Sequence, residues 1–220
     1  MKILAVDTAL GACSAAILDN DKVLAHRFVA MERGHAEALA PMVADVVRES
    51  GLAFSALERL AVTTGPGTFT GQRVGLAFMR GLRVALKRPL IGITTLDAMC
   101  AAALEEANMQ FAAAIHDARR GEAYLSVVST TQTVLPPSLV VLDQAAAKIS
   151  SLIPSGASIA LAGTAAEVVA AKMSAGYLTS IRQPDARWVA RLARHAPETN
   201  DAPHPLYLRA PDAKLPTARP

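Results

Sequence analysis

Cysteine is rare in this chain, with two residues in 220, and aromatic residues make up only 4%. Cys13 and Cys100 lie far apart and form no Cys-x-x-Cys pair, which argues against a disulfide framework. We therefore expect two buried free thiols in a reducing compartment. The scarcity of aromatic residues, together with heavy use of alanine, favours a core of closely packed small side chains.

Long hydrophobic runs are also missing. No stretch of about 18 uninterrupted apolar residues occurs, so the sequence predicts no membrane-spanning helix. The apolar stretch 2–6 is interrupted by Asp7 and is too short for the core of a signal peptide. We expect a cytoplasmic protein that makes no contact with a membrane.

The excess of positive charge is small. Charged residues make up 19% of the chain, both signs are mixed, and the formal net charge is +3. No basic run interleaved with aromatic residues occurs, so a nucleic-acid groove is not indicated. Apolar residues account for 52%, which suffices for a substantial core in one large domain or two small ones.

Familiar catalytic motifs are absent as well. His35 begins a helix-like run but has Leu39, not a second histidine, four residues further on. The other histidines form no spaced cluster, and no Gly-x-Ser-x-Gly motif surrounds a serine. We therefore expect no metal site, no cofactor of the chain's own and no activated nucleophile.

The most informative stretch present is the glycine-rich segment 65–75. It follows an apolar run and precedes a helix-like run, an order in which free backbone N–H groups and a helix dipole favour anions. It is not a Walker A motif, because no Gly-Lys-Ser/Thr closes it. Asp7 and Thr8, at the end of the first strand, could face the same anion, and a capping or turn role is the alternative for them. The candidate anion- or nucleotide-facing residues are Asp7, Thr8, Gly65, Gly67, Thr68, Thr70 and Gly71.

Two expected helices, 35–50 and 70–87, carry a second candidate surface. The second helix contains Gly71, Gly75 and Gly81, each costing about 1 kcal/mol relative to alanine, so a packing reason is needed. Close packing on the protein's own sheet and contact with another subunit are both open. The candidate partner-interface residues are His35, Leu39, Met42, Val46, Arg73, Gly75, Leu76, Arg80 and Arg83.

A third cluster lies on an expected hairpin between strands 111–116 and 122–129. Its members are Asp117, Arg119, Glu122 and Tyr124. A local network of ion pairs across the hairpin is the simpler interpretation, and a binding role is the alternative.

The order of elements indicates an α/β protein with two lobes, 1–108 and 109–220. Three leading strands predict an antiparallel meander, and the later strands alternate with helices, which adds parallel strands to a mixed sheet. In the second half, Pro136-Pro137 is expected to break the chain and the last ten residues to form a loose tail. The other expected elements are strands 2–6, 13–18, 22–29, 60–64, 90–94 and 158–162 and helices 95–107, 143–152, 164–173 and 185–195.

Taken together, several motifs in this order resemble the TsaB (YeaZ) family, bacterial subunits of the tRNA threonylcarbamoyladenosine machinery. The resemblance covers nearly the whole chain, and the Gly-Pro-Gly-Thr-Phe-Thr-Gly loop is its most specific part. The motifs are 3–8, 13–16, Gly34-His35, the loop 65–75, 94–96, 117–124 and 205–209.

The resemblance implies an actin-like (ribonuclease H-like) fold whose two lobes each have a mixed sheet flanked by helices. It implies a non-catalytic scaffold that pairs with the catalytic paralogue TsaD, or with itself when alone, through helices 35–50 and 70–87. It further implies that the ATPase TsaE joins, that tRNA is reached indirectly through the complex, and that the subunit junction is a candidate site for a nucleotide.

Departures from catalytic members of the superfamily agree with this interpretation. The turn 63–67 contains no second carboxylate, and Gly163-Thr164 lacks the second glycine of an adenosine-contacting pair. Gln72 stands where the family usually has leucine, which could alter the helix contact, and Thr68 replaces the common serine but keeps the hydroxyl. The alternative function is an actin-fold kinase or ATPase acting on a small molecule.

Overall fold

The computed structural model describes residues 1–199 and 201–209. The first sheet has the strand order β3-β2-β1-β4-β5, with β1–β3 antiparallel and β4 and β5 added in parallel. The predicted mixed five-stranded sheet is therefore confirmed. Its strands are β1 (Lys2–Asp7), β2 (Ala12–Asp19), β3 (Lys22–Ala30), β4 (Arg59–Thr63) and β5 (Leu90–Ile93).

The second sheet repeats this topology. Its order is β10-β9-β6-β7-β8, so β6 takes the central place that β1 has in the first sheet. Again the three leading strands are antiparallel and the two later ones parallel to the first. The strands are β6 (Phe111–Arg119), β7 (Glu122–Ser129), β8 (Thr133–Val141), β9 (Ile159–Ala162) and β10 (Gly176–Leu178).

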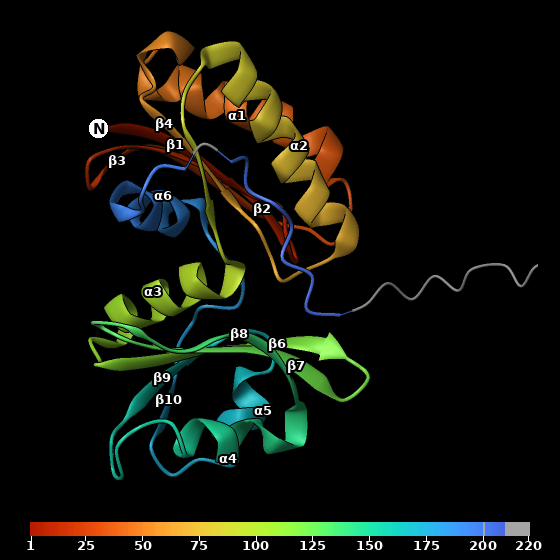
Figure 1. Ribbon diagram of the computed structural model, residues 1–220, viewed down its shortest axis with the longest axis vertical. Helices are drawn as coiled ribbons and strands as arrows, with labels where there is room; N and C mark the ends of the chain where they lie inside the picture. The colour runs from red at the N-terminus through yellow and green to blue at the C-terminus, as the bar shows by residue number, and fades with distance from the viewer. Residues whose placement is uncertain (200, 210–220) are drawn as a thin grey trace, which may run out of the picture.

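Helices cover both faces of each sheet (Figure 1). On the first sheet, α1 (His35–Ser50) and α2 (Phe69–Leu86) lie side by side on one face, and α6 (Ala186–His195) packs on the other. On the second sheet, α3 (Thr95–Ala107) lies on the face toward the first lobe, and α4 (Ala145–Ser150) and α5 (Ala166–Ala170) on the far face. Short 3₁₀ turns occur at Phe54–Ala56 and Leu142–Gln144.

The chain thus returns to the first sheet after completing the second. Helix α6 is capped by the Asp185 carboxylate, which accepts a hydrogen bond from the Arg187 N–H at 2.8 Å, as its sequence predicts. The buried residues of α6 pack against the first sheet. The predicted lobe 109–220 had placed this helix with the second sheet. As a domain boundary, residue 108 stays a prediction.

One expectation about the second lobe is wrong. Pro136-Pro137 does not break the chain but lies within β8, which is tolerated because β8 is an edge strand and pairs only with β7. Strand β10 was not expected, because three residues are too few to show an alternating pattern. The predicted loose tail, 211–220, lies outside the described residues.

No helix in residues 1–199 and 201–209 is long and apolar enough to cross a membrane.

One buried cation fixes α6 to the first sheet. The Arg59 guanidinium, at the start of β4, is 5% exposed and donates to the carbonyls of Ala193, Arg194 and Ala196 at 2.6–3.2 Å. It also pairs with the Glu198 carboxylate at 2.7 Å. The positive charge lies at the helix C-terminus, where the last carbonyls have no partners within the helix.

We expect Arg59→Met to lower the free energy of unfolding by about 2–4 kcal/mol, since the substitution leaves these carbonyls without their charged donor. Chemical denaturation monitored by circular dichroism measures the loss. Arg48→Met on α1 is the matched control, because Arg48 is exposed and its ion pair with Asp45 should contribute no more than about 1 kcal/mol. Equal losses in the two variants would contradict the role given to Arg59.

Candidate functional site

The glycine-rich loop before α2 is packed against the end of β1. The Thr68 N–H donates to the Ala9 carbonyl at 2.8 Å, and a Cβ added at Gly67 would overlap that same oxygen. A Cβ at Gly71 would overlap the Thr8 carbonyl oxygen. The two glycines are therefore required by the close approach of two backbone segments of this chain.

The same contact uses the polar groups that a phosphate loop would offer to a ligand. The Thr8 hydroxyl donates to the Gly71 carbonyl at 2.7 Å and accepts from the Gly75 N–H at 3.0 Å. The Thr68 hydroxyl caps α2 by accepting from the Gly71 N–H at 3.1 Å. These side chains and amides of the loop are occupied within the protein.

Asp7 lies at the centre of this contact and is fully buried. Its Oδ1 accepts from the Thr63 hydroxyl at 2.6 Å and from the Ala9 N–H at 3.1 Å, while Oδ2 has no partner among the described residues. Burial raises the pKa of the Asp7 carboxyl to about 7, against the two hydrogen bonds, which lower it. The carboxyl therefore does not reach solvent or a ligand in this conformation.

The candidate anion-facing residues fall into three groups, which line the cavity, are buried, or are exposed outside it. Gly67 and Thr68 line the cavity between the lobes. Asp7, Thr8, Gly65 and Gly71 are buried in contacts within the chain, so for these four the expectation is corrected. Thr70 is exposed but lies outside the cavity lining.

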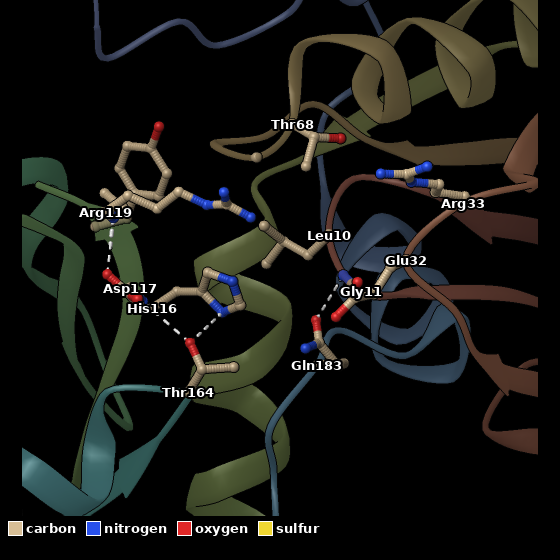
Figure 2. Close-up of a pocket in the computed structure, with 13 residues that line it drawn as sticks. Leu10, Gly11, Glu32, Arg33, Thr68, His116, Asp117, Arg119, Thr164 and Gln183 are labelled. Carbon is tan, nitrogen blue, oxygen red and sulfur yellow. Dashed lines mark hydrogen bonds between the residues drawn. The ribbon is translucent and has the colours of Figure 1, made fainter.

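The cavity between the lobes has a volume of about 560 Å³ (Figure 2). The first lobe contributes the turn after β1, the loop before α1 and the loop before α2; the second contributes the end of β6 and Thr164. The lining residues are Leu10, Gly11, Glu32, Arg33, Gly67, Thr68, His116, Asp117, Ala118, Arg119, Tyr124, Thr164 and Gln183.

His116 and Gln183 shape the lower part of this cavity (Figure 2). Burial lowers the pKa of the His116 imidazole to about 4, so the ring is neutral at neutral pH, with Nδ1 3.3 Å from the Thr164 hydroxyl. The Gln183 Oε1 accepts from the Gly11 N–H at 3.0 Å and joins the chain leading into α6 to the first lobe. Nothing in the sequence pattern singled out Gln183.

Among the described residues, neither Asp117 nor Glu122 forms an ion pair with Arg119, so the expected local network across the hairpin is not seen there. Asp117 Oδ1 accepts from the backbone N–H of Arg119 at 2.7 Å, and Glu122 pairs with Arg209 of the C-terminal segment. Arg209 also donates to the Ala118 carbonyl at 3.0 Å. The carboxylates therefore order the turn and attach segment 201–209, whereas Arg119 and Tyr124 line the cavity.

The predicted partner interface is also divided. Six candidates are buried within the protein's own core or loops and present little surface to another subunit: His35, Leu39, Met42, Val46, Gly75 and Leu76. His35 Nε2 donates to the Leu10 carbonyl at 3.0 Å. Arg73, Arg80 and Arg83 keep exposed surface, and their interface role stays a prediction.

The exposed surface of α1 and α2 includes a set of small residues that were not among these candidates, apart from the larger and charged residues there. Ala36, Ala40 and Ala44 follow one another at helical spacing on α1, and Ala77 and Gly81 do so on α2. A Cβ at Gly81 would meet nothing within 4 Å, and Val84 is 77% exposed. This set is called the small-residue face below.

Segment 201–209 adds an aromatic group beside that face, which sequence reasoning missed. Tyr207 stacks on Phe69 with ring centroids 5.6 Å apart, and its hydroxyl accepts from Arg73 Nε at 2.9 Å. The Arg73 guanidinium lies 3.4 Å from the Phe69 ring centroid. Phe69 and Tyr207 remain 52% and 44% exposed. The motif 205–209 was recognised in the sequence, but its contact with Phe69 was not predicted.

Gln72 is buried beneath the loop and does not face outward. Its Nε2 donates to the Gly67 carbonyl at 3.0 Å, and Oε1 has no partner among the described residues. Any effect of Gln72 on pairing with another subunit must therefore act through the loop.

The chain is similar in sequence and in fold to known families and proteins. Residues 23–213 match the family described as TsaD, tRNA N6-adenosine threonylcarbamoyltransferase. The chain is 36% identical over 150 residues to the tRNA threonylcarbamoyladenosine biosynthesis protein TsaB of Escherichia coli, covering 64% of each chain. It is 37% identical to TsaB of Haemophilus influenzae over 58% of this chain and 54% of that protein. These matches span less than two thirds of either relative's length.

Longer matches come from other relatives. An uncharacterised protein of Mycobacterium tuberculosis is 32% identical over 96% of this chain and 93% of its own length. The solved structure of YeaZ from Pseudomonas aeruginosa has a TM-score of 0.81 at 29% identity, covering 94% of this chain and 99% of that one. A dehydratase component of Acidaminococcus fermentans, with a TM-score of 0.54 at 10% identity, shares the fold alone.

The buried Asp7 carboxyl leads to a pH-dependent prediction. Its pKa is about 3.8 in an unfolded chain and about 7 in the folded protein, so the folded state binds the proton more tightly between these values. The free energy of unfolding should therefore fall as pH rises from about 4 to 7, by at most about 4 kcal/mol. Asp7→Asn removes this titration, so its stability relative to the native protein should rise across the same window.

Urea unfolding of both proteins at several pH values between 4 and 8 measures this difference. Asp143→Asn is the control, because Asp143 is exposed and its pKa is lowered by Lys172, so no such rise is expected. A difference between Asp7→Asn and the native protein that stays constant from pH 4 to 7 would contradict a proton on buried Asp7.

Proposed function

The chain belongs to the TsaB/YeaZ family, and on this premise we propose that it is a non-catalytic subunit of the tRNA threonylcarbamoyladenosine machinery. In this role it supports a TsaD-type partner, which attaches threonylcarbamoyl to N6 of the adenosine next to the anticodon in tRNAs that read codons beginning with A. The relatives named TsaB are biosynthesis proteins for this modified nucleoside.

The burial of Asp7 is the single observation that carries the non-catalytic role. A kinase or ATPase of this fold needs a carboxylate at the end of the first strand that reaches a metal-bound nucleotide. Here that carboxylate is hydrogen-bonded to Thr63 and covered by the loop, and its raised pKa increases the fraction that is neutral below about pH 7. This argues against the alternative function, a small-molecule kinase or ATPase.

The small-residue face is the surface that we propose for pairing. Exposed alanine and glycine let two helices approach closely, and the Phe69–Arg73–Tyr207 group beside them has the residue types that dominate protein interfaces. The match to the TsaD family supports a partner with a related first lobe, so that the heterodimer has a pseudo-two-fold axis. Without that partner, two copies of this chain pair through the same face.

The rest of the assembly is part of the same proposal. The protein acts in the cytoplasm, TsaE joins the pair, and tRNA is reached through the complex. The chain holds no cofactor of its own, and a nucleotide is bound at the junction of the subunits.

We expect Gly81→Glu to prevent pairing while leaving the fold intact. A side chain at Gly81 has open space in the isolated chain but would place a charge in the middle of the proposed contact. Co-purification with a tagged TsaD-type partner should fall at least tenfold, and the melting temperature of the isolated chain should change little.

Ala147→Glu is the matched control, because Ala147 is exposed on α4 of the second lobe. It should co-purify like the native protein. Undiminished co-purification of Gly81→Glu would contradict the small-residue face as the pairing surface. Gly75 and Leu76 are unsuitable for this test, because their substitution would disturb the core.

A further inference from the structure

Two arginines in the cavity between the lobes have no partner for their guanidinium groups among the described residues. Arg33, from the loop before α1, and Arg119, from the end of β6, both line the cavity. Figure 2 shows their guanidinium groups pointing toward one another from opposite walls, below Thr68. Within residues 1–199 and 201–209 neither group makes a hydrogen bond or ion pair, in contrast to Arg59, Arg187 and Arg209.

The backbone of Arg119 adds an independent observation. Arg119 and Arg120 have φ angles of 64° and 59°, in the left-handed region that glycine or asparagine adopts at lower cost. Arginine at Arg119 is thus energetically unfavourable for the turn itself. Such an outlier in a cavity wall indicates that the side chain has a use besides folding.

The other polar groups limit which ligand fits. Glu32 and Asp117 also line the cavity, so its formal charge is balanced as a whole. In Figure 2 the Asp117 carboxylate lies on the side of β6 away from Arg33, which leaves the Thr68 end positive. Thr68 also caps the 18-residue helix α2, whose dipole favours an anion at this end.

A metal-bound nucleotide does not fit this arrangement. The Thr68 and Gly71 amides and the Thr8 and Thr68 hydroxyls already make hydrogen bonds within the chain, and Asp7 is buried. Among the described residues no group of three acidic, histidine or cysteine side chains could hold a metal ion. The available chemistry is a pair of guanidinium groups, which bind carboxylate or phosphate directly.

We propose that this cavity is a metal-independent site for a small organic anion, with its phosphate or carboxylate group held between Arg33 and Arg119. The site is separate from the small-residue face and does not depend on pairing. Its volume of about 560 Å³ admits a metabolite-sized molecule, and neutral His116 and Thr164 line the opposite end, where they offer hydrogen bonds to its uncharged part.

Arg119→Gly gives a sharp test, because it removes the guanidinium and relieves the positive φ angle at the same time. We expect its melting temperature to be equal to or higher than that of the native protein. Isothermal titration calorimetry at low ionic strength with EDTA present then compares inorganic phosphate, succinate and adenosine monophosphate as probes. The three probes distinguish a phosphate group, a carboxylate group and a larger phosphate ester.

At least one probe should bind the native protein, and its affinity should fall at least tenfold in both Arg119→Gly and Arg33→Gln. Arg48→Gln is the charge-matched control, because Arg48 lies at the opposite end of α1 from Arg33, and it should bind like the native protein. A parallel titration replaces EDTA with Mg²⁺. The proposal is overturned if no probe binds, if a probe binds only in the Mg²⁺ titration, or if all three arginine variants lose affinity equally. Since the isolated chain is used, failure here leaves the pairing role untouched.

Discussion

The close approach of the end of β1 to the loop before α2 determines much else in this structure. Backbone oxygens of Thr8 and Ala9 occupy the space where Cβ atoms of Gly71 and Gly67 would lie, so only glycine permits the contact. The Thr68 hydroxyl then accepts from the Gly71 N–H in the first turn of α2, and the Thr8 hydroxyl accepts from the Gly75 N–H one turn further on. A loop whose sequence is typical of an anion site therefore contacts groups of its own chain, and Asp7 is buried behind it.

Much of the fold was predictable from the sequence, because periodicity and turn residues are local signals. The mixed five-stranded first sheet and the bounds of α1 and α3 follow from them, whereas the strand order was not predicted. The candidate interface was less predictable. Leu39, Met42 and Leu76 form an apolar helix face, and such a face has the same spacing whether it contacts the chain's own sheet or another protein.

The residues that sequence reasoning missed are those whose neighbours are distant in the chain. Tyr207 meets Phe69, Arg209 meets the β6–β7 hairpin, and Arg33 faces Arg119 only because two lobes and a returning segment bring them together. No local pattern contains these pairs. The structure therefore separates two surfaces, the outward small-residue face and the cavity between the lobes. We propose a protein partner for the first and a small organic anion for the second.

The central claim is that the filled loop and the enclosed Asp7 leave this chain unable to use a metal-bound nucleotide. Calorimetric titration of the isolated chain with ATP, with Mg²⁺ and with EDTA, combined with a phosphate-release assay, tests it most directly. The account predicts no Mg²⁺-dependent binding in the micromolar range and no phosphate release. Micromolar binding that requires both Mg²⁺ and Asp7 and is accompanied by turnover would contradict it.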